Sequence, residues 1–114
     1  MTVQVEIAKR IDNDLVEAFQ RLIPQLSKSN PAPTKEQLES IVASDSSHIL
    51  LAKVDDVIVG SLTLVIFHIP TGIRAWIEDV VVDADARGKG VGEELNKFAP
   101  VSYTHLTLPT KRIV

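Results

Sequence analysis

Apolar and polar residues alternate with a period of two at the start of the chain, where Val3–Ile7 is predicted to form a short strand. A strand-like apolar pattern returns in three longer segments in the middle of the chain: His48–Val54, Val57–Phe67 and Arg74–Asp83. Asp55-Asp56 predicts a hairpin between the first two of these segments. The segment His68–Gly72 predicts the turn before the third.

Apolar residues at helical spacing predict two helices between the first strand and the second. Asp14 and Glu17 have the spacing of a capping box at the start of the first helix, and Pro24 is expected to kink or end it. Its apolar stripe is formed by Leu15, Phe19, Leu22, Ile23 and Leu26. Thr34 is expected to cap the second helix, after the loop Ser27–Pro33.

A polar, glycine-rich loop, Ala84–Gly92, follows the last strand and leads into a third helix. Pro100 is expected to break this helix in its second turn, because proline has no N–H and clashes with the preceding turn. The resulting order is β-α-α-β-β-β-α, with no internal repeat. It predicts a single α/β (α+β) domain over residues 1–99.

The composition is that of a small globular protein. The chain has 114 residues, 45% of them hydrophobic and 24% charged, which leaves room for one domain and excludes disorder. It has no run of about 20 apolar residues that would span a membrane. The net charge of −3 argues against binding to nucleic acid. Because it has no cysteine and no secretory signal, we expect a soluble cytoplasmic protein without disulfides or thiolate metal sites.

The loop DADARGKGVG, Asp83–Gly92, is the segment best suited to carry chemistry. Its three glycines permit positive φ angles and remove Cβ atoms, so that successive backbone N–H groups can approach a ligand. The start of the following helix adds unpaired N–H donors and a partial positive charge. Arg87 and Lys89 place two cations beside these donors. Together these features predict a site for a phosphate or pyrophosphate.

Two common phosphate-binding loops fit this segment poorly. A Walker loop needs Gly-Lys followed by Ser or Thr, and the dinucleotide fingerprint needs G-x-G-x-x-G directly after its strand. The pattern Arg87-x-x-Gly90-x-Gly92 instead resembles the acyl-CoA pyrophosphate loop of the GNAT N-acetyltransferase superfamily. The element order is similar to the first part of that fold, which has a mixed sheet. Ile77–Asp83 resembles the matching strand of glucosamine-6-phosphate N-acetyltransferases.

This resemblance implies an enzyme that transfers the acetyl group of acetyl-CoA to a primary amine by direct attack on the thioester, without a metal. The pantetheine would lie along the backbone of the last strand, where the N–H of Val81 is the expected donor to the thioester oxygen. The diphosphate would lie in the loop. The residues implied in donor binding are Val80, Val81, Val82, Arg87, Gly88, Lys89, Gly90, Val91 and Gly92.

Glu78 and Asp79 are the candidates for the general base. On a regular strand only one of them faces the cleft, and we favour Glu78, acting directly or through a water, over Asp79. The alternative is that either carboxylate merely pairs with Arg74 or a surface lysine. The acceptor would be the amine of a small molecule or peptide, and a complete protein would be compatible with a homodimer.

Two other functions stay open at this point. One is a non-catalytic acyl-CoA-binding or sensing module of the same fold, which would bind CoA without transferring an acyl group. The other is an unrelated nucleotide-phosphate-binding protein, which would prefer ATP or NAD to CoA.

The end of the chain differs from the rest. Val101–Thr110, VSYTHLTLPT, resembles the translation of a transposase adapter used to prepare sequencing libraries, so we expect residues 100–114 to be a non-native tail. The alternative is a native polar tail that forms a β-hairpin. The acetyltransferase domain would then be truncated after Ala99. Trp76–Val82 would be left as an unpaired apolar edge, and we expect the 114-residue chain to be insoluble or molten, and inactive.

Overall fold

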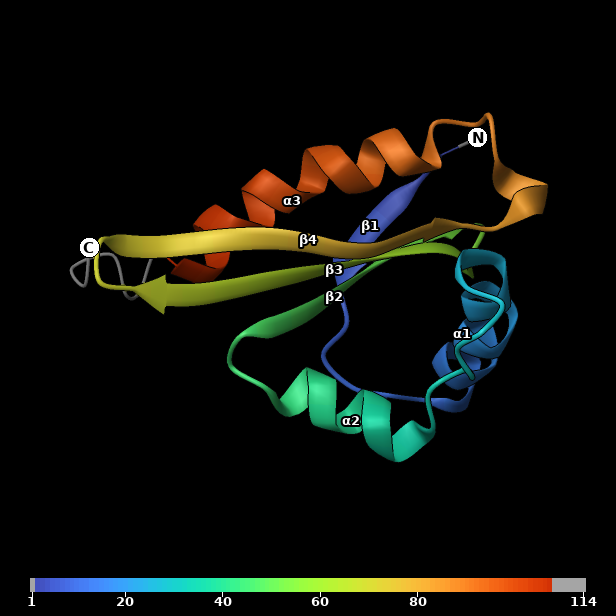
Figure 1. Cartoon of the computed structure of the whole chain (residues 1–114). Coiled ribbons are helices and arrows are strands. Elements are labelled where there is room, and N and C mark those ends of the chain that lie inside the picture. Colours follow the sequence, from blue (N-terminus) through green and yellow to red (C-terminus); the bar gives the residue numbers. More distant parts are fainter. Residues whose placement is uncertain (1, 108–114) are drawn as a thin grey trace.

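The computed structural model describes residues 2–107, and the side chains of residues 2–104 (Figure 1). Its four strands form one antiparallel sheet in the order β1-β2-β3-β4. The strands are β1 (Gln4–Ile7), β2 (Ser47–Val54), β3 (Val57–Ile69) and β4 (Gly72–Val82). The predicted β-α-α-β-β-β-α order is confirmed, with one 3-10 turn, Ala84–Ala86, added before the last helix. No helix in the described part of the chain is long and apolar enough to cross a membrane.

The helices cover both faces of the sheet, and each face has its own apolar core. The helices α1 (Asn13–Leu26) and α2 (Lys35–Ala43) lie on one face, and α3 (Val91–Thr107) lies on the other (Figure 1). Neighbouring residues of β2 point to opposite faces, so Leu50 packs in the core under α3 and Leu51 in the core under α1 and α2. The sheet is therefore buried from two sides in its central part.

The helix caps agree with the sequence prediction at one helix and differ at the other. Thr34 caps α2 in a complete capping box with Gln37, as predicted. The cap of α1 is Asp12 and not Asp14, because the extended residue Asp12 accepts a hydrogen bond from the Leu15 N–H at 2.9 Å. Pro24 lies inside α1, which ends two residues later at Leu26.

Pro100 does not break α3, contrary to the prediction. The helix continues to Thr107, although proline removes one N–H from its hydrogen-bond ladder. Residues on both sides of the proline are buried, with Ala99 only 2% and Ser102 only 1% exposed. Packing of this helix face against the sheet offsets the local cost of the proline.

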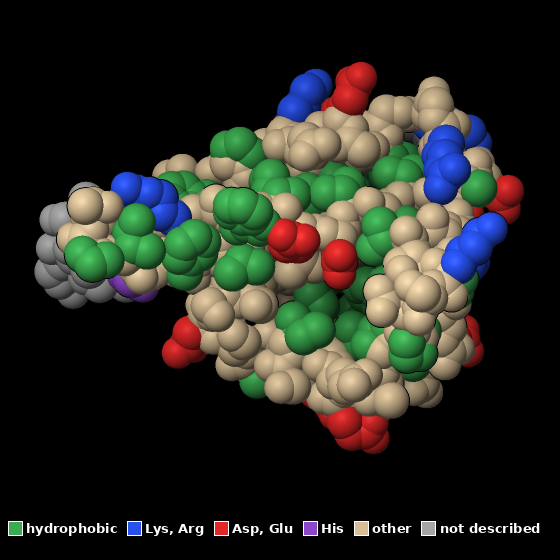
Figure 2. Space-filling view, viewed as in Figure 1, with side chains coloured by type: hydrophobic (Ala, Val, Ile, Leu, Met, Phe, Trp, Pro, Cys, Tyr) green, Lys and Arg blue, Asp and Glu red, His purple; other side chains and the backbone are tan. Residues whose placement is uncertain are grey.

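The hairpin between β3 and β4 is longer and tighter than predicted. Strand β3 extends to Ile69 and β4 begins at Gly72, which leaves only Pro70-Thr71 between them. In the described part of the chain, β4 has no strand on its second side. Apolar side chains gather along it (Figure 2), among them Trp76, which is 58% exposed, and Ile77, which is 43% exposed. The predicted apolar edge is therefore present.

Gly60 of β3 lets α3 approach the sheet closely, a role that the sequence did not reveal. A Cβ atom at Gly60 would lie 3.1 Å from the Val81 carbonyl oxygen, 3.1 Å from Val91 Cγ1 and 3.3 Å from Leu95 Cδ1. We expect Gly60→Ala to lower the free energy of unfolding by about 1–3 kcal/mol, because the helix must move outward. Urea unfolding measures this loss, and an unchanged midpoint would contradict the close packing.

Candidate functional site

A β-bulge interrupts β4 where the two candidate carboxylates lie. Glu78 pairs with Thr63 and Val81 pairs with Ser61, so Asp79 and Val80 together lie opposite a single residue of β3. Asp79 has a φ angle of 50°, in the left-handed region that residues other than glycine seldom adopt. The assumption of a regular strand is therefore wrong here, and the alternation of faces does not extend across the bulge.

The hydrogen-bond phase of β4 decides which backbone groups face its open side. The Asp83 N–H donates to the Val59 carbonyl oxygen at 2.8 Å. Because alternate residues of an antiparallel strand point their backbone groups toward the partner strand, Val81 also faces β3, where it pairs with Ser61. The Val82 N–H then points to the open side. This phase argues against the Val81 N–H as an outward donor and favours Val82.

Glu78 lies on the α1–α2 face of the sheet. Val81, opposite Ser61, packs in the core beneath α1, so Ser61 points to that face. Thr63 lies two residues further along β3 and points to the same face, and Glu78 is opposite Thr63. The Glu78 carboxylate accepts a hydrogen bond from the indole N–H of Trp76. Arg74 contacts Thr71 Oγ1 instead, at 3.1 Å, so the expected alternative of an Arg74–Glu78 pair is not what the structure contains.

The loop after β4 combines one fixed end with an open glycine-rich stretch. Arg87 Nε donates to the Val82 carbonyl oxygen at 3.2 Å, which folds the loop back on the end of the strand. Gly88 and Gly90 both have φ angles of 80°. A Cβ atom at either glycine would meet nothing within 4 Å, so it is the backbone conformation that requires glycine there.

The N-terminus of α3 opens into a shallow pocket beside this loop. The Gly90 carbonyl oxygen accepts the first helical hydrogen bond, from the Glu94 N–H at 3.0 Å, so the N–H groups of the first turn have no partner inside the helix. The pocket has a volume of about 340 Å³. Its lining residues are Val82, Ala86, Arg87, Gly88, Gly90, Val91, Gly92 and Glu93.

The structure therefore brings together most of the residues predicted to bind the donor. Arg87, Gly88, Gly90, Val91 and Gly92 line the pocket together with Val82. Lys89 is exposed in the same loop but is not among the lining residues. An arginine and the N–H groups of a helix N-terminus are groups that can hold an anion such as a diphosphate.

A larger cavity lies between β1 and α1. Its volume is about 910 Å³, it runs from β1 along α1, and it shares no lining residue with the pocket at α3. Acidic and basic side chains both line it, including Arg10, Asp14 and Glu17. In the residues that the structure describes, no three His, Cys, Asp or Glu side chains gather where they could hold a metal ion.

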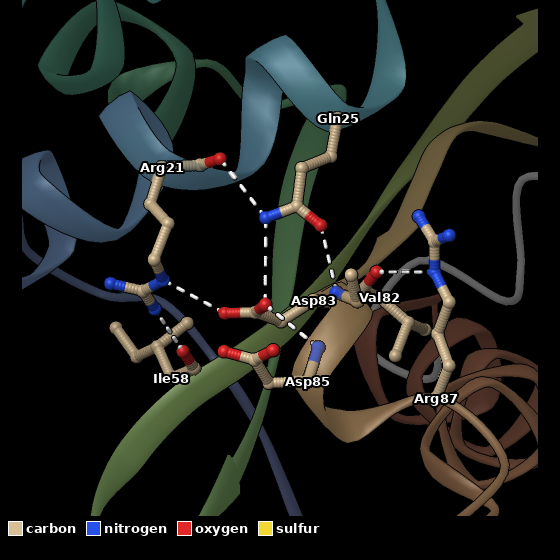
Figure 3. Close-up of polar contacts among 8 residues, drawn as sticks. Arg21, Gln25, Ile58, Val82, Asp83, Asp85 and Arg87 are labelled. Carbon is tan, nitrogen blue, oxygen red and sulfur yellow. Dashed lines mark hydrogen bonds and ion pairs between the residues drawn. The ribbon is translucent and has the colours of Figure 1, made fainter.

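A polar cluster around the buried carboxylate of Asp83 joins the start of the loop to α1, and sequence reasoning missed it. We call Arg21, Gln25 and Asp83 the Asp83 cluster (Figure 3). Asp83 is 8% exposed, and its Oδ2 lies 2.8 Å from Arg21 Nε. Arg21 Nη2 also donates to the Ile58 carbonyl oxygen at 2.6 Å. Arg21 is 62 positions from Asp83 and 37 from Ile58, so no local sequence pattern predicts these contacts.

The cluster lowers the pKa of Asp83. Burial is the largest single effect and raises the pKa, but hydrogen bonds from Arg21, the Asp85 N–H and Gln25 together outweigh it. The pKa consequently lies below the ordinary value of 3.8. A carboxylate with a lowered pKa contributes stability at pH values above its unfolded pKa, and this contribution is lost as the pH falls through the folded pKa.

We therefore expect Asp83→Asn to destabilise the protein most at neutral pH. The expected loss at pH 7 is about 1.5–3 kcal/mol, the usual range for a hydrogen bond to a charged group. The difference between parent and variant should shrink below pH 4, where the Asp83 carboxylate becomes protonated in the unfolded chain and then in the folded one. Urea unfolding at pH 7, 5 and 3 measures it, and a difference that stays constant with pH would refute the role of the ionised carboxylate.

Comparison with known proteins connects this arrangement to one family. The model of the acetyltransferase (GNAT) family matches residues 9–99. A search among curated proteins finds no match. The matched segment contains the bulge, the loop and the first turns of α3.

Solved structures share the fold at low sequence identity. An aminoglycoside acetyltransferase from an uncultured soil metagenomic sample, in complex with sisomicin, is 22% identical with a TM-score of 0.78, over 90% of this chain and 70% of that one. A ribosomal-protein-alanine N-acetyltransferase from Brucella melitensis biovar Abortus 2308 is 19% identical with a TM-score of 0.73, over 94% of this chain and 75% of that one. Glucosamine-6-phosphate N-acetyltransferase from Arabidopsis thaliana is 24% identical with a TM-score of 0.69, over 87% of this chain and 72% of that one.

The family match covers most of the chain, and the fold and the glycine-rich loop agree with it. The resemblance inferred from the loop is thus confirmed: the chain belongs to the acetyltransferase (GNAT) family.

Proposed function

We propose that this chain carries the donor-binding part of an N-acetyltransferase that transfers the acetyl group of acetyl-CoA to a primary amine. The observation that carries the proposal is the pocket at the N-terminus of α3, where Arg87 and unpaired N–H groups meet beside two glycines at positive φ. This pocket suits the diphosphate of a CoA ester. Family membership supports the same reading.

The open side of β4 supports the proposed path of the pantetheine. The bulge residue Val80 has no partner in the register, and the Val82 N–H points away from β3. The Val82 N–H is therefore on the open side of the strand that leads into the loop, and the Val80 backbone is left unpaired by the bulge. We propose the N–H groups of Val80 and Val82, in place of Val81, as the donors that hold the pantetheine and polarise the thioester oxygen.

In the proposed reaction a neutral amine attacks the thioester carbon. A C–N bond forms, the C–S bond breaks, and the CoA thiolate leaves and is protonated. One proton must leave the amine, and Glu78 is the proposed acceptor of that proton, with Asp79 as the second candidate. The exposed position of Glu78 on the α1–α2 face, next to Trp76, supports access to an amine from that side.

We expect Glu78→Gln to lower kcat by about 100-fold at neutral pH, the lower range of general-base effects. The measurement uses a chimera in which the C-terminal part of an active relative completes the domain. Asp79→Asn tests the second candidate in the same assay, since it removes the neighbouring charge and leaves Glu78 in place. An unchanged pH–rate profile for Glu78→Gln would remove Glu78 from this role.

The proposed acceptor is the amine of a small molecule or peptide. Structural neighbours include an enzyme named for aminoglycosides, one for glucosamine-6-phosphate and one for a ribosomal protein alanine. At identities below 25% these names do not select among acceptors for this chain. A panel of amines offered to the chimera, with release of free CoA as the readout, identifies the class.

Isothermal titration calorimetry tests the donor. Acetyl-CoA should bind with a stoichiometry of one and should not be displaced by ATP or NAD at equal concentration. Preference for ATP or NAD would overturn the proposal. Binding of acetyl-CoA by the chain, combined with no transfer to any amine by the chimera, would favour the alternative of an acyl-CoA-sensing module of the same fold.

We also retain the proposal that residues 100–114 are a non-native tail. The family match ends at Ala99, which agrees with it. Residues 108–114 of this segment lie outside the described residues. Sequencing the source DNA past codon 99 tests the proposal, which fails if VSYTHLTLPT is encoded there.

A further inference from the structure

The Asp83 cluster fixes the place where the loop leaves the sheet. Asp83 is the last residue before the 3-10 turn and caps it, since its carboxylate accepts the Asp85 N–H at 3.2 Å. Gln25 Oε1 accepts the Ala84 N–H at 2.7 Å, and Gln25 Nε2 reaches Asp83 Oδ1 at 3.5 Å. Two side chains of α1 therefore hold two successive residues at the start of the loop (Figure 3).

The part of the loop that follows has few restraints of its own. Arg87 contacts the end of β4, but a Cβ atom at Gly88 or Gly90 would meet no atom of the protein within 4 Å. The position of the glycine stretch is therefore set by its two ends. One end is the start of α3, packed on Gly60, and the other is the Asp83 cluster.

We infer that Arg21 and Gln25 are positioning residues for donor binding, which act through Asp83 and Ala84 to hold the loop where its N–H groups converge on the diphosphate. The inference rests on the proposed function, and it adds two residues of α1 that lie outside the loop pattern. None of Arg21, Gln25 and Asp83 lines the pocket at α3, so they act on the ligand through the loop.

A purely structural role for the cluster makes a different prediction. If Arg21 only stabilised the fold, its removal would weaken all ligands of the site equally, or none. If it positions the loop, its removal weakens the ligand that reaches the loop and spares a ligand that does not. Acetyl-CoA contains the diphosphate, whereas S-acetylpantetheine lacks it. Comparing the affinities of the two ligands therefore distinguishes a positioning role from a purely structural one.

The experiment compares the affinities of both ligands in the full chain, with Ile77→Lys present throughout to charge the open strand edge. We expect Arg21→Ala to weaken acetyl-CoA about tenfold, within the usual range of coupling between neighbouring sites, and to leave S-acetylpantetheine unchanged. Lys53→Ala is the control, because it removes another ion pair, that of Lys53 with Glu6 at 2.6 Å, whose two residues belong neither to the Asp83 cluster nor to the lining of the pocket at α3. It should change neither affinity.

Gln25→Ala keeps the Arg21–Asp83 ion pair, and it replaces Arg21→Ala in the experiment if Arg21→Ala does not fold. It should weaken acetyl-CoA in the same selective way and should speed hydrogen exchange of the Ala84 amide. Equal losses for both ligands, or no loss with either variant, would overturn the inference. If the parent chain does not bind acetyl-CoA at all, the proposed function is wrong. The positioning role is tested separately by hydrogen exchange, because an unchanged exchange rate of the Ala84 amide in Gln25→Ala would overturn it.

Discussion

Gly92→Ala is expected to make the protein more stable and at the same time to weaken acetyl-CoA binding about 100-fold, which corresponds to about 2.7 kcal/mol. Gly92 is the second residue of α3, and a Cβ atom there would lie 3.7 Å from Val82 Cγ2, an ordinary contact. Alanine in a helix is favoured over glycine by about 0.5–1 kcal/mol, so unfolding should become harder.

Binding should fall because Gly92 also lines the pocket beside the loop. A methyl group on the first helical turn occupies space next to the N–H groups that the diphosphate must reach. Thermal unfolding and calorimetric titration of acetyl-CoA measure the two effects on the same sample. Their opposite signs separate a blocked ligand site from a damaged fold.

Asn96→Ala is the matched control for Gly92→Ala. It raises helix propensity in α3, one turn further on, at an exposed residue outside the pocket. It also removes the hydrogen bond from Asn96 Nδ2 to the Gly92 carbonyl oxygen at 3.0 Å, but it leaves the N–H groups of the first turn and the space beside them unchanged. It should leave acetyl-CoA affinity unchanged. If Gly92→Ala binds acetyl-CoA as tightly as the parent does, the diphosphate does not lie at the start of α3, and the proposed donor site is wrong.

The second large effect concerns the open side of β4. Ile77→Lys is expected to convert a self-associating chain into a mainly monomeric one, with at least about a tenfold gain in soluble protein. The reason is that the phase of the β3–β4 ladder points the Ile77 backbone away from β3, and its side chain is 43% exposed. An unpaired apolar strand of this kind recruits a further strand, and a lysine on it opposes that pairing.

Val57→Lys controls for the added charge. Val57 is 55% exposed, and it lies at the β2–β3 hairpin instead of the open edge. Light scattering coupled to size-exclusion chromatography compares parent and variants at equal concentration. If Val57→Lys solubilises the chain as well as Ile77→Lys does, or if the parent is already monomeric, the strand edge is not the cause of association.

The sequence predicted the glycine-rich loop well because its signal is local. Arg87, Gly90 and Gly92 lie within six residues, and the backbone angles that glycine permits depend on neighbours in the chain. The same holds for the Thr34 capping box. The cap of α1 was misplaced by two residues because Asp12 and Asp14 both suit the position, and only the observed geometry selects between them.

The candidate carboxylates could be located by sequence but not oriented. Whether Glu78 or Asp79 faces a given side depends on the bulge, which arises from the register between β3 and β4. A single extra residue on one strand changes the face of every side chain beyond it. The same register is the reason that we propose Val80 and Val82, in place of Val81, as the backbone donors.

The sequence by itself determined the order of elements, the family and the position of the glycine-rich loop, since these depend on periodicity and on residues close together in the chain. Only the tertiary structure decided the continuation of α3 past Pro100, the close packing at Gly60 and the contact of Arg21 and Gln25 with Asp83. These features depend on burial and on pairs of residues far apart in the sequence, whose proximity exists only after the sheet has formed.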